Sequence, residues 1–365
     1  MEKSSLQNSR AWRRAIFVFV SLVAAHTVNA QIGGLPGAYL RAPVGAAAFS
    51  MGGAQSASPE YACTWWNPAM LALVRQTQID AGGGLRSLGR TEGFTSLQFK
   101  ITPRVGMGIF ALYRGDGSLD NLYDENEQIL EKGAFASYTA KIGLSYLAAR
   151  KLSLGVNIAY YYQQLPSAYY QSSLIYSSAS AMGGFDFAVR YTPTGRWALA
   201  AVVQNIDLLK VLSGKSATVD MNWEIASGDN LNAAVVDKIV PTAVFASRYE
   251  WSLAGYPFFW NCDLHAYVTD GDFTKLDLME IRLNNGVEWK RWSRFVVRAG
   301  LGDMLLNRNV WTNSQNFSDE FAPRVSLGFG ADLVRVHRGL RFNYGIATDR
   351  TGAGVDQQVE FSYSF

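Results

Sequence analysis

The carboxyl-terminal stretch of the chain alternates between apolar and polar residues: residues 355–365 read VDQQVEFSYSF. On a β-strand, successive side chains point to opposite faces. This stretch therefore has one apolar face, formed by Val359, Phe361, Tyr363 and Phe365, and one polar face. The same alternation, with its faces assigned alike, recurs along the chain, which indicates a transmembrane β-barrel with lipid outside and water or protein inside.

Fourteen segments alternate in this way. Each keeps a period of two over about ten residues, which is the length that a tilted membrane-crossing strand needs. The count is even, as in bacterial barrels made from one chain. We therefore predict an all-β fold, a 14-stranded antiparallel transmembrane β-barrel formed by residues 77–365. The predicted strands are centred near Ile79, Gln98, Ile109, Ile142, Val156, Phe187, Val202, Phe245, Leu264, Leu283, Val297, Phe329, Tyr344 and Phe361.

The connections between the predicted strands alternate in length. Those after even-numbered strands are short, and four after odd-numbered strands are long. Barrels of this class have short periplasmic turns and long outer loops, so both chain ends are expected in the periplasm. The long connections are Gly115–Ala134, Leu165–Ala181, Asp207–Ile239 and Gly302–Ala322.

The first 30 residues have the features of a secretory signal peptide. Arg10, Arg13 and Arg14 precede the short apolar run Ile16–Ala25, and small residues around Ala30 offer a cleavage site. We expect cleavage after Ala30 and insertion into the outer membrane of a diderm bacterium, among its lipids. The formal net charge of +3 belongs to this leader, so nothing in the remaining chain favours nucleic acid as a partner.

Residues 31–76, here called the hatch segment, do not alternate. Asn67 precedes Pro68 in a pattern typical of a helix start, with Asn67 as the cap. From periodicity alone, the segment either fills the barrel as a plug or packs under the periplasmic mouth. At the other end of the chain, Tyr363 and Phe365 close the last strand with the terminal aromatic residues that barrels present to the insertion machinery.

Part of the hatch segment resembles a known family. The residues are Gly37-Ala38-Tyr39-Leu40-Arg41, the run from Val44 to Ala54, and Trp65-Trp66-Asn67-Pro68-Ala69. They are similar to the amino-terminal pattern of the PorV/PorQ family, within the FadL-like group of fourteen-stranded outer-membrane barrels. Ala47 and Ser50 depart from that pattern, which usually has Arg and Gly there. The resemblance implies a hatch motif formed by Gly52, Gly53, Trp65, Trp66, Asn67, Pro68 and Ala69.

Charged residues recur on the inward faces of the predicted strands. Both signs occur on neighbouring strands, and unpaired charges in a narrow interior are costly. We therefore expect a structural network of polar residues in the lumen, with a polar permeation path as the alternative. The expected members are Arg190, Arg248, Glu280, Arg282, Arg298, Asp332, Arg341 and Glu360.

The sequence offers little for catalysis. Only His265 and His337 follow the leader, and no hydrolase, metalloprotease or phosphate-loop motif occurs. We expect no enzyme, no metal and no cofactor. Cys63 and Cys262 are expected to stay unpaired, because Cys262 points outward.

Two functions remain. The resemblance implies an accessory or cargo-binding component of type IX protein secretion, with secretion subunits or secreted proteins as partners. The alternative is a FadL-like channel that takes a hydrophobic ligand into its lumen. Most inward positions are small or polar, with Phe110, Leu112, Tyr161 and Val296 as exceptions, and this favours secretion over transport of apolar molecules.

Overall fold

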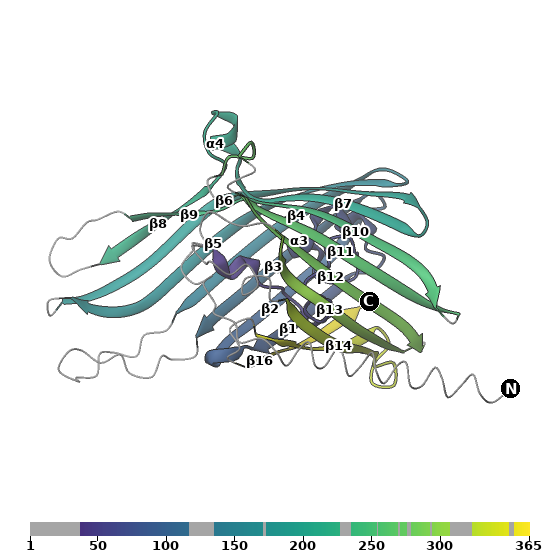
Figure 1. The fold of residues 1–365 in the computed structure, drawn as a ribbon. Coiled ribbons are helices and arrows are strands. Elements are labelled where there is room, and N and C mark those ends of the chain that lie inside the picture. Colours follow the sequence, from purple (N-terminus) through teal and green to yellow (C-terminus); the bar gives the residue numbers. More distant parts are fainter. Residues whose placement is uncertain are drawn as a thin grey trace.

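The computed structural model describes residues 37–116, 135–170, 173–226, 235–253, 255–268, 271–275, 279–292, 294–306, 323–349 and 354–365. The expected signal peptide and most of the long connections Gly115–Ala134 and Gly302–Ala322 lie outside the described residues. Nearly all regular structure in the described part is antiparallel β-sheet (Figure 1).

Helices are few and short. The α-helices are α2 (Ala46–Ser50), α3 (Cys63–Trp66) and α4 (Leu208–Leu212), and the 3-10 helices are η1 (Ala38–Arg41), η2 (Pro68–Leu73) and η3 (Ser87–Gly89). Within the described residues, no helix is long and apolar enough to cross a membrane.

The strands follow one another mostly as antiparallel neighbours. They are β1 (Gln78–Leu85), β2 (Arg90–Thr102), β3 (Val105–Asp116), β4 (Ala136–Ala149), β5 (Leu152–Tyr170), β6 (Ser173–Thr194), β7 (Trp197–Asp207), β8 (Val219–Ala226), β9 (Val235–Ile239), β10 (Thr242–Leu253), β11 (Tyr256–Val268), β12 (Met279–Trp292), β13 (Phe295–Leu305), β14 (Arg324–Asp332), β15 (Leu340–Thr348) and β16 (Val355–Ser364).

Fourteen of these strands close into a ring. β1 pairs with both β2 and β16, β5 pairs with β6, and β7 pairs directly with β10. β8 and β9 are not members of the ring, because β8 pairs with the far end of β6 and, among the described strands, β9 pairs only with β8. The prediction of a closed 14-stranded barrel is confirmed, and each of the fourteen predicted centres lies within a ring strand.

The alternation in the sequence separates the two faces of the wall. In β16, Val355, Val359 and Phe361 are exposed, whereas Gln358 and Glu360 are buried. Large apolar side chains are exposed in the same way on the other strands. This is the outward apolar belt of a barrel that faces lipid.

An aromatic row marks the edge of this belt on β3, β4 and β5. The rings of Tyr113 and Tyr138 have centroids 5.2 Å apart, and those of Tyr138 and Tyr162 lie 5.9 Å apart. Tyrosine is favoured at the headgroup level because its ring is apolar and its hydroxyl is polar. The row therefore marks the boundary between lipid and water at the end of the barrel that carries the long connections.

Two expected outer loops contain regular structure, which corrects the sequence-based boundaries. Most of Leu165–Ala181 is strand, because β5 and β6 continue as a long hairpin beyond the belt. Asp207–Ile239 contains α4, β8 and β9. Both were predicted as loops because a strand beyond the bilayer has no lipid-facing side and loses its apolar alternation.

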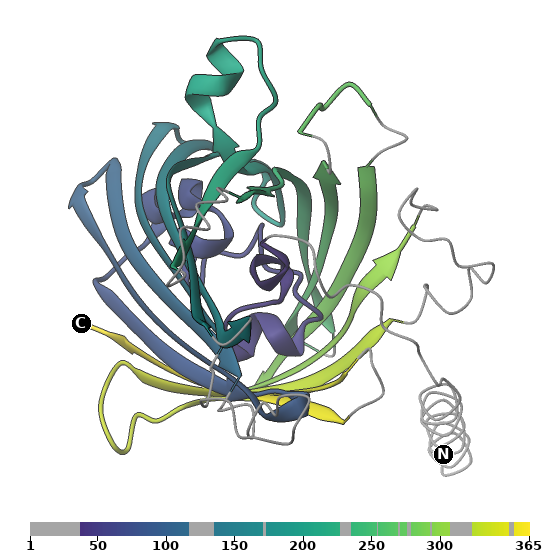
Figure 2. The same cartoon turned by 90° about the vertical axis from the view of Figure 1, so that its left-hand side faces the viewer.

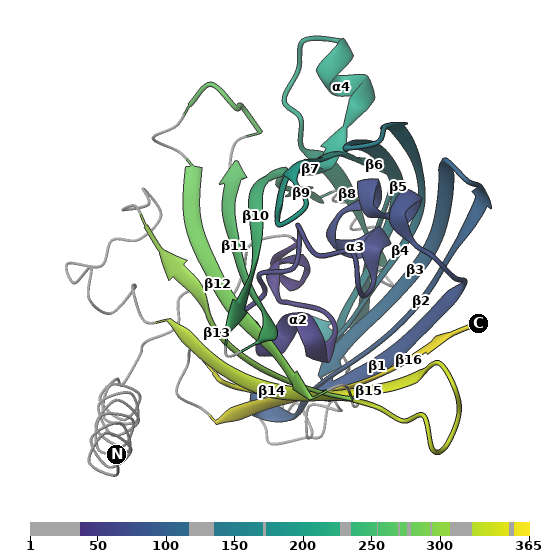
Figure 3. The same cartoon turned by 90° about the vertical axis from the view of Figure 1, so that its right-hand side faces the viewer.

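The hatch segment lies inside the ring. Figures 2 and 3 look along the barrel from its two ends, and both show α2 and α3 surrounded by strands. α2 contacts β13 to β16, and η2 contacts β2 to β6 on the opposite side. The segment therefore fills the interior as a plug rather than lying under the mouth.

The carboxyl terminus lies at the end of the barrel that carries the short turns. The ring of Tyr363 packs edge-on against His337 in the β14–β15 turn, with centroids 5.0 Å apart. Tyr363 and Phe365 stack at 5.5 Å, and the backbone N–H of Phe365 donates to the carbonyl of Thr77, which precedes β1. The final residue thus extends the seam between the first and last strands.

Lipid exposure of this face predicts how charges are tolerated on β16. Val359 lies mid-strand and Val355 at the strand end, and both are exposed. Val359→Arg should destabilise the barrel by about 2–4 kcal/mol, and the matched variant Val355→Arg by about 0–1 kcal/mol, because the cost of a charge falls toward the interface. Urea unfolding in lipid vesicles measures both. Equal costs, or no cost at Val359, would contradict a lipid-facing surface.

Candidate functional site

Carboxylates of the wall bind the backbone of the hatch segment. Three of them, from β1, β11 and β16, are fully buried and accept hydrogen bonds from backbone N–H groups inside the ring. A buried N–H without a partner is costly, and a carboxylate is a strong acceptor. The bonds join Asp80 to Ala62 (3.1 Å), Asp263 to Gln55 (3.0 Å) and Ser56 (2.8 Å), and Glu360 to Ala47 (3.1 Å).

Neutral side chains of the wall add further bonds. Gln98 Oε1 accepts from the N–H of Cys63 at 3.2 Å, and Ser326 Oγ accepts from the N–H of Gly52 at 2.9 Å. Asn157 Nδ2 donates to the carbonyl of Thr64 at 2.7 Å. These contacts come from strands on opposite sides of the ring, so the segment is held from several directions.

Glycines on the inward faces of the strands make room for the segment. A Cβ at Gly155 would overlap the backbone N of Ala69, and one at Gly106 would overlap the carbonyl of Leu71. Glycine in a strand interior is typical of a place where another backbone approaches closely. Further wall glycines whose Cβ would overlap the hatch segment are Gly108, Gly286, Gly300, Gly302, Gly328 and Gly345.

The residues of the predicted hatch motif are all buried, and several of them form hydrogen bonds within the segment. Asn67 caps η2 by accepting from the N–H of Ala69 at 2.9 Å, and its amide donates to the carbonyl of Ser56 at 2.8 Å. Pro68 occupies the first helical position. Trp66 Nε1 donates to the carbonyl of Val44 at 3.2 Å. One asparagine thus fixes two stretches of the segment against each other.

Gly52 and Gly53 form a turn pressed against β12 and β13. Their φ angles are 68° and 89°, in the left-handed region where glycine is favoured. A Cβ at Gly52 would lie 2.6 Å from the carbonyl carbon of Leu301. These two glycines are therefore required by backbone conformation and by close packing together.

The predicted lumen charges are divided among several ion pairs. Arg298 pairs with Glu288 at 2.7 Å and donates to Asn343, and Arg282 pairs with Glu280. Arg190 donates to the carbonyl of Ala57 at 3.4 Å, and Glu360 holds Ala47 as described. Arg341 and Asp332 pair at 2.9 Å but remain about two-fifths exposed. Much of this set therefore binds the hatch segment or its immediate surroundings.

Glu60 of the hatch segment forms an ionic contact with two wall strands. Its carboxylate lies 2.7 Å from Lys290 Nζ and 3.5 Å from Arg248 Nη2. Burial alone would raise the pKa of Glu60, but the positive charges of Lys290 and Arg248 outweigh it and hold that pKa below its usual range. Glu60 stays ionised and ties the segment to β10 and β12.

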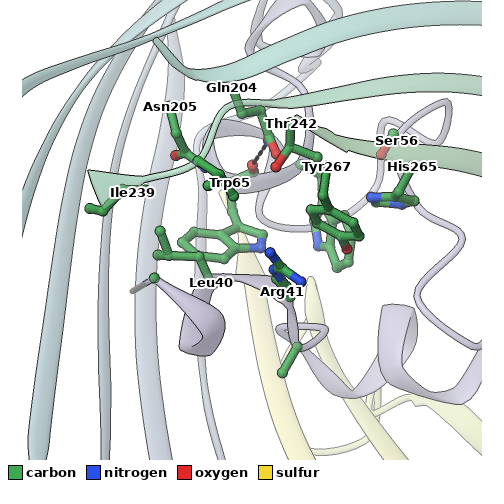
Figure 4. A pocket seen from close by; sticks show the side chains of 14 residues that line it. Leu40, Arg41, Ser56, Trp65, Gln204, Asn205, Ile239, Thr242, His265 and Tyr267 are labelled. Carbon is green, nitrogen blue, oxygen red and sulfur yellow. Dashed lines mark hydrogen bonds between the residues drawn. The ribbon is translucent and has the colours of Figure 1, made fainter. Parts of the chain in front are cut away.

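A narrow pocket lies between the hatch segment and the wall (Figure 4). Its apolar side is formed by Leu40, Trp65 and Ile239, and its polar side includes Gln204 and His265. Its cavity volume is about 40 Å³. A cavity of roughly 150 Å³ holds benzene, so the pocket is too small for an aromatic ring in this state.

Two apolar clusters meet beside this pocket. One joins Trp65 and Trp66 to Phe110 and Leu112 of β3, and the other joins Tyr161 of β5 to residues of β6, β8 and β9. Leu40 packs against both clusters. The interior therefore has a continuous apolar region on one side of the hatch segment. The prediction from the inward positions of the strands underestimated the size of this region.

Several residues that bind the hatch segment were missing from the predicted set. Asp80, Gln98 and Asn157 sit at inward positions that the alternation identified only as polar, and their partners are far away in the sequence. The inward glycines, such as Gly155, were the available signal of close backbone approach. Among the predicted exceptions, Val296 is only partly buried and belongs to neither apolar cluster.

No cluster of metal-ligating side chains is found among the described residues. Cys63 and Cys262 are both free, with Cys63 buried in the hatch segment and Cys262 on the outer side of β11.

The sequence matches no known family, whereas the fold matches several solved structures. No protein-family model matches the chain, and no curated protein matches it. The toluene transporter TodX of Pseudomonas putida matches with a TM-score of 0.57 and 13% identity, over 92% of this chain and 100% of that chain. The toluene transporter TbuX of Ralstonia pickettii matches with a TM-score of 0.56 and 10% identity, over 89% and 99%.

A third solved structure has the same fold. A FadL homologue of Pseudomonas aeruginosa has a TM-score of 0.55 and 11% identity, over 88% of this chain and 98% of that chain. At these identities the likeness establishes the fold alone. The chain has a FadL-like barrel with an internal hatch.

The close approach at Gly155 gives a test of how the hatch segment is held. Gly155→Ala should displace Pro68 and Ala69 from the wall, because the new Cβ and the hatch backbone cannot share the same space. Protease cutting within residues 60–75 should then rise well above the wild-type rate, while the barrel keeps its heat-modifiable gel mobility.

The matched control is Gly195→Ala, in a short turn where a Cβ meets nothing within 4 Å. It should leave the cutting rate at the wild-type level. Wild-type protection in the Gly155 variant would show that the hatch segment is not held by this contact.

Proposed function

We propose that the protein is an outer-membrane channel for hydrophobic small molecules. The observation that carries this proposal is the apolar region between the hatch segment and the wall, where Leu40 bridges the two apolar clusters. Binding of an apolar molecule there becomes more favourable in proportion to the apolar area that is removed from water. The FadL-like fold supports the same interpretation, since the fold neighbours TodX and TbuX carry the description of toluene transporters.

The size of the pocket indicates that the described state is closed. Its free space is well below that needed for an aromatic ring, as shown above. A ligand enters only when the hatch segment or the side chains of Trp65 and Leu40 shift. The segment is held by many separate polar contacts to the wall, so a local shift near the pocket costs less than release of the whole segment.

The pocket also favours a ligand with one polar group. Arg41 Nη2 and His265 Nε2 are buried and have no hydrogen-bond partner among the described residues. Arg41 is fixed by Glu280 at 3.3 Å and lies 4.3 Å from the ring centre of Tyr267. A buried polar atom without a partner is costly, so an oxygen of the ligand would satisfy groups that the protein leaves unpaired.

The secretion hypothesis stays a prediction. It rests on the resemblance of the hatch segment to the PorV/PorQ pattern, and the structure gives Gly52, Gly53 and Asn67 packing roles within the chain. Such roles serve a hatch in a transporter equally well. The expected scarcity of apolar inward positions, which favoured secretion, is explained by the glycines and carboxylates that hold the hatch segment. Co-purification from native membranes distinguishes the two: secretion subunits or cargo support secretion, and bound apolar molecules support transport.

Uptake by cells tests the proposal directly. Cells without another hydrophobic channel should take up radiolabelled toluene or oleate faster when they produce the wild-type chain. Leu40→Asp should reduce this uptake to near the background of cells without the protein, because it places a charge between the two apolar clusters. Leu40 belongs to the hatch segment, so assembly of the wall should be unchanged.

The matched control is Val336→Asp, which places the same charge at an exposed position in the β14–β15 turn. It should keep wild-type uptake. If the wild-type chain gives no uptake of either compound above background, or if Leu40→Asp takes up both at the wild-type rate, the channel proposal is wrong.

A further inference from the structure

Helix α4 carries an apolar surface on the outside of the barrel. It follows β7 directly, and Figures 1 and 2 show it beyond the ring of strands rather than over the opening. Leu209 and Leu212 are each 75% exposed, and Val211 is 43% exposed. A single turn of helix with three exposed aliphatic side chains is unusual for a surface in water.

Asp207 and Lys210 of this turn bind groups of the protein itself. Asp207 caps the helix by accepting from the N–H of Lys210 at 3.1 Å. Lys210 Nζ lies 2.6 Å from Asp220 of β8 and donates to the carbonyl of Thr218 at 2.9 Å. The charge of Lys210 is therefore paired with β8 and the segment before it, and the helix presents Leu209, Val211 and Leu212 outward.

The strand register places the start of α4 beside outward residues of the lipid-facing belt. Asp207 is opposite Gly184 on β6, and Gly184 is opposite Ala159 on β5. The next residue, Tyr160, is exposed on the outer face and is opposite Met182, which is 82% exposed. Tyr162 of the aromatic row is the next outward residue along β5. The apolar surface of α4 therefore continues the belt at its outer edge.

We propose that α4 lies on the outer leaflet and inserts Leu209, Val211 and Leu212 among the acyl chains beside the wall. An apolar helix face held at the interface buries itself in the boundary between headgroups and chains. Continuity with the belt selects lipid as the occupant, because Tyr160 and Met182 are exposed on the lipid-facing side of the wall beside α4.

Spin labels report this contact directly. In a Cys262→Ala background, single cysteines replace Leu209 or Leu212 and are labelled in the folded barrel, with one copy in each lipid nanodisc. Cys63 is buried and stays unlabelled. Both labels should be relaxed more strongly by oxygen, which concentrates in lipid, than by a water-soluble nickel chelate. Their accessibility ratio should approach that of a label replacing Phe245, which is 60% exposed on β10.

The aqueous reference is a label replacing Arg338 in the exposed β14–β15 turn. Heat-modifiable mobility shows that each labelled variant is folded, and the two helix positions serve as independent variants. A nickel-dominated profile at both positions, like that at Arg338, would overturn the proposal. That profile is the one expected if α4 is reserved for a protein partner, a second copy of the chain or a soluble ligand.

Discussion

Backbone buried inside a barrel needs hydrogen-bond partners from its own segment or from the wall, and the hatch segment depends on both. It contains only short helices, so many of its N–H groups have no partner of their own. Asp80, Asp263 and Glu360 supply acceptors from three separate strands, and each is fully buried. The inward glycines then bring the two backbones close enough for these bonds to form. Hydrogen bonds from the wall and glycines without side chains therefore act together to hold the hatch segment.

The fold could be predicted from the sequence because lipid imposes a simple rule on each strand. Val359 and Phe361 face lipid and Glu360 faces inward, and the same rule located all fourteen ring strands. Where the strands leave the bilayer the rule ends, and the extended hairpin of β5 and β6 was therefore expected as a loop. The docking of the hatch segment could not be predicted in detail, because contacts such as Asp263 with Ser56 join residues 207 positions apart and one sequence holds no signal for such pairs.

The candidate site was only partly visible for the same reason. Asn67 and Pro68 predicted a capped helical turn, because such a turn depends on neighbouring residues alone. The apolar cluster beside the pocket, by contrast, needs Leu40 from the hatch segment, Ile239 from β9 and Tyr161 from β5 to meet. An inward glycine such as Gly155 was visible, but a glycine in a strand also occurs at bulges and bends. Polar inward positions were therefore taken as evidence against an apolar interior, whereas many of them surround a hatch that itself brings the apolar residues.

The order of the chain has a consequence for biogenesis. The hatch segment is synthesised before the strands that bind it, and the bond between Ala47 and Glu360 spans 313 residues. Contacts so distant in sequence form late, because a long loop must close first. Trp65 and Trp66 are synthesised before Phe110 and Leu112 of β3, on which they pack, and the bonds to the segment are complete only when the final strand arrives. During that interval the apolar residues of the segment are exposed and favour aggregation, so a chaperone that shields them would serve the barrel as much as the hatch.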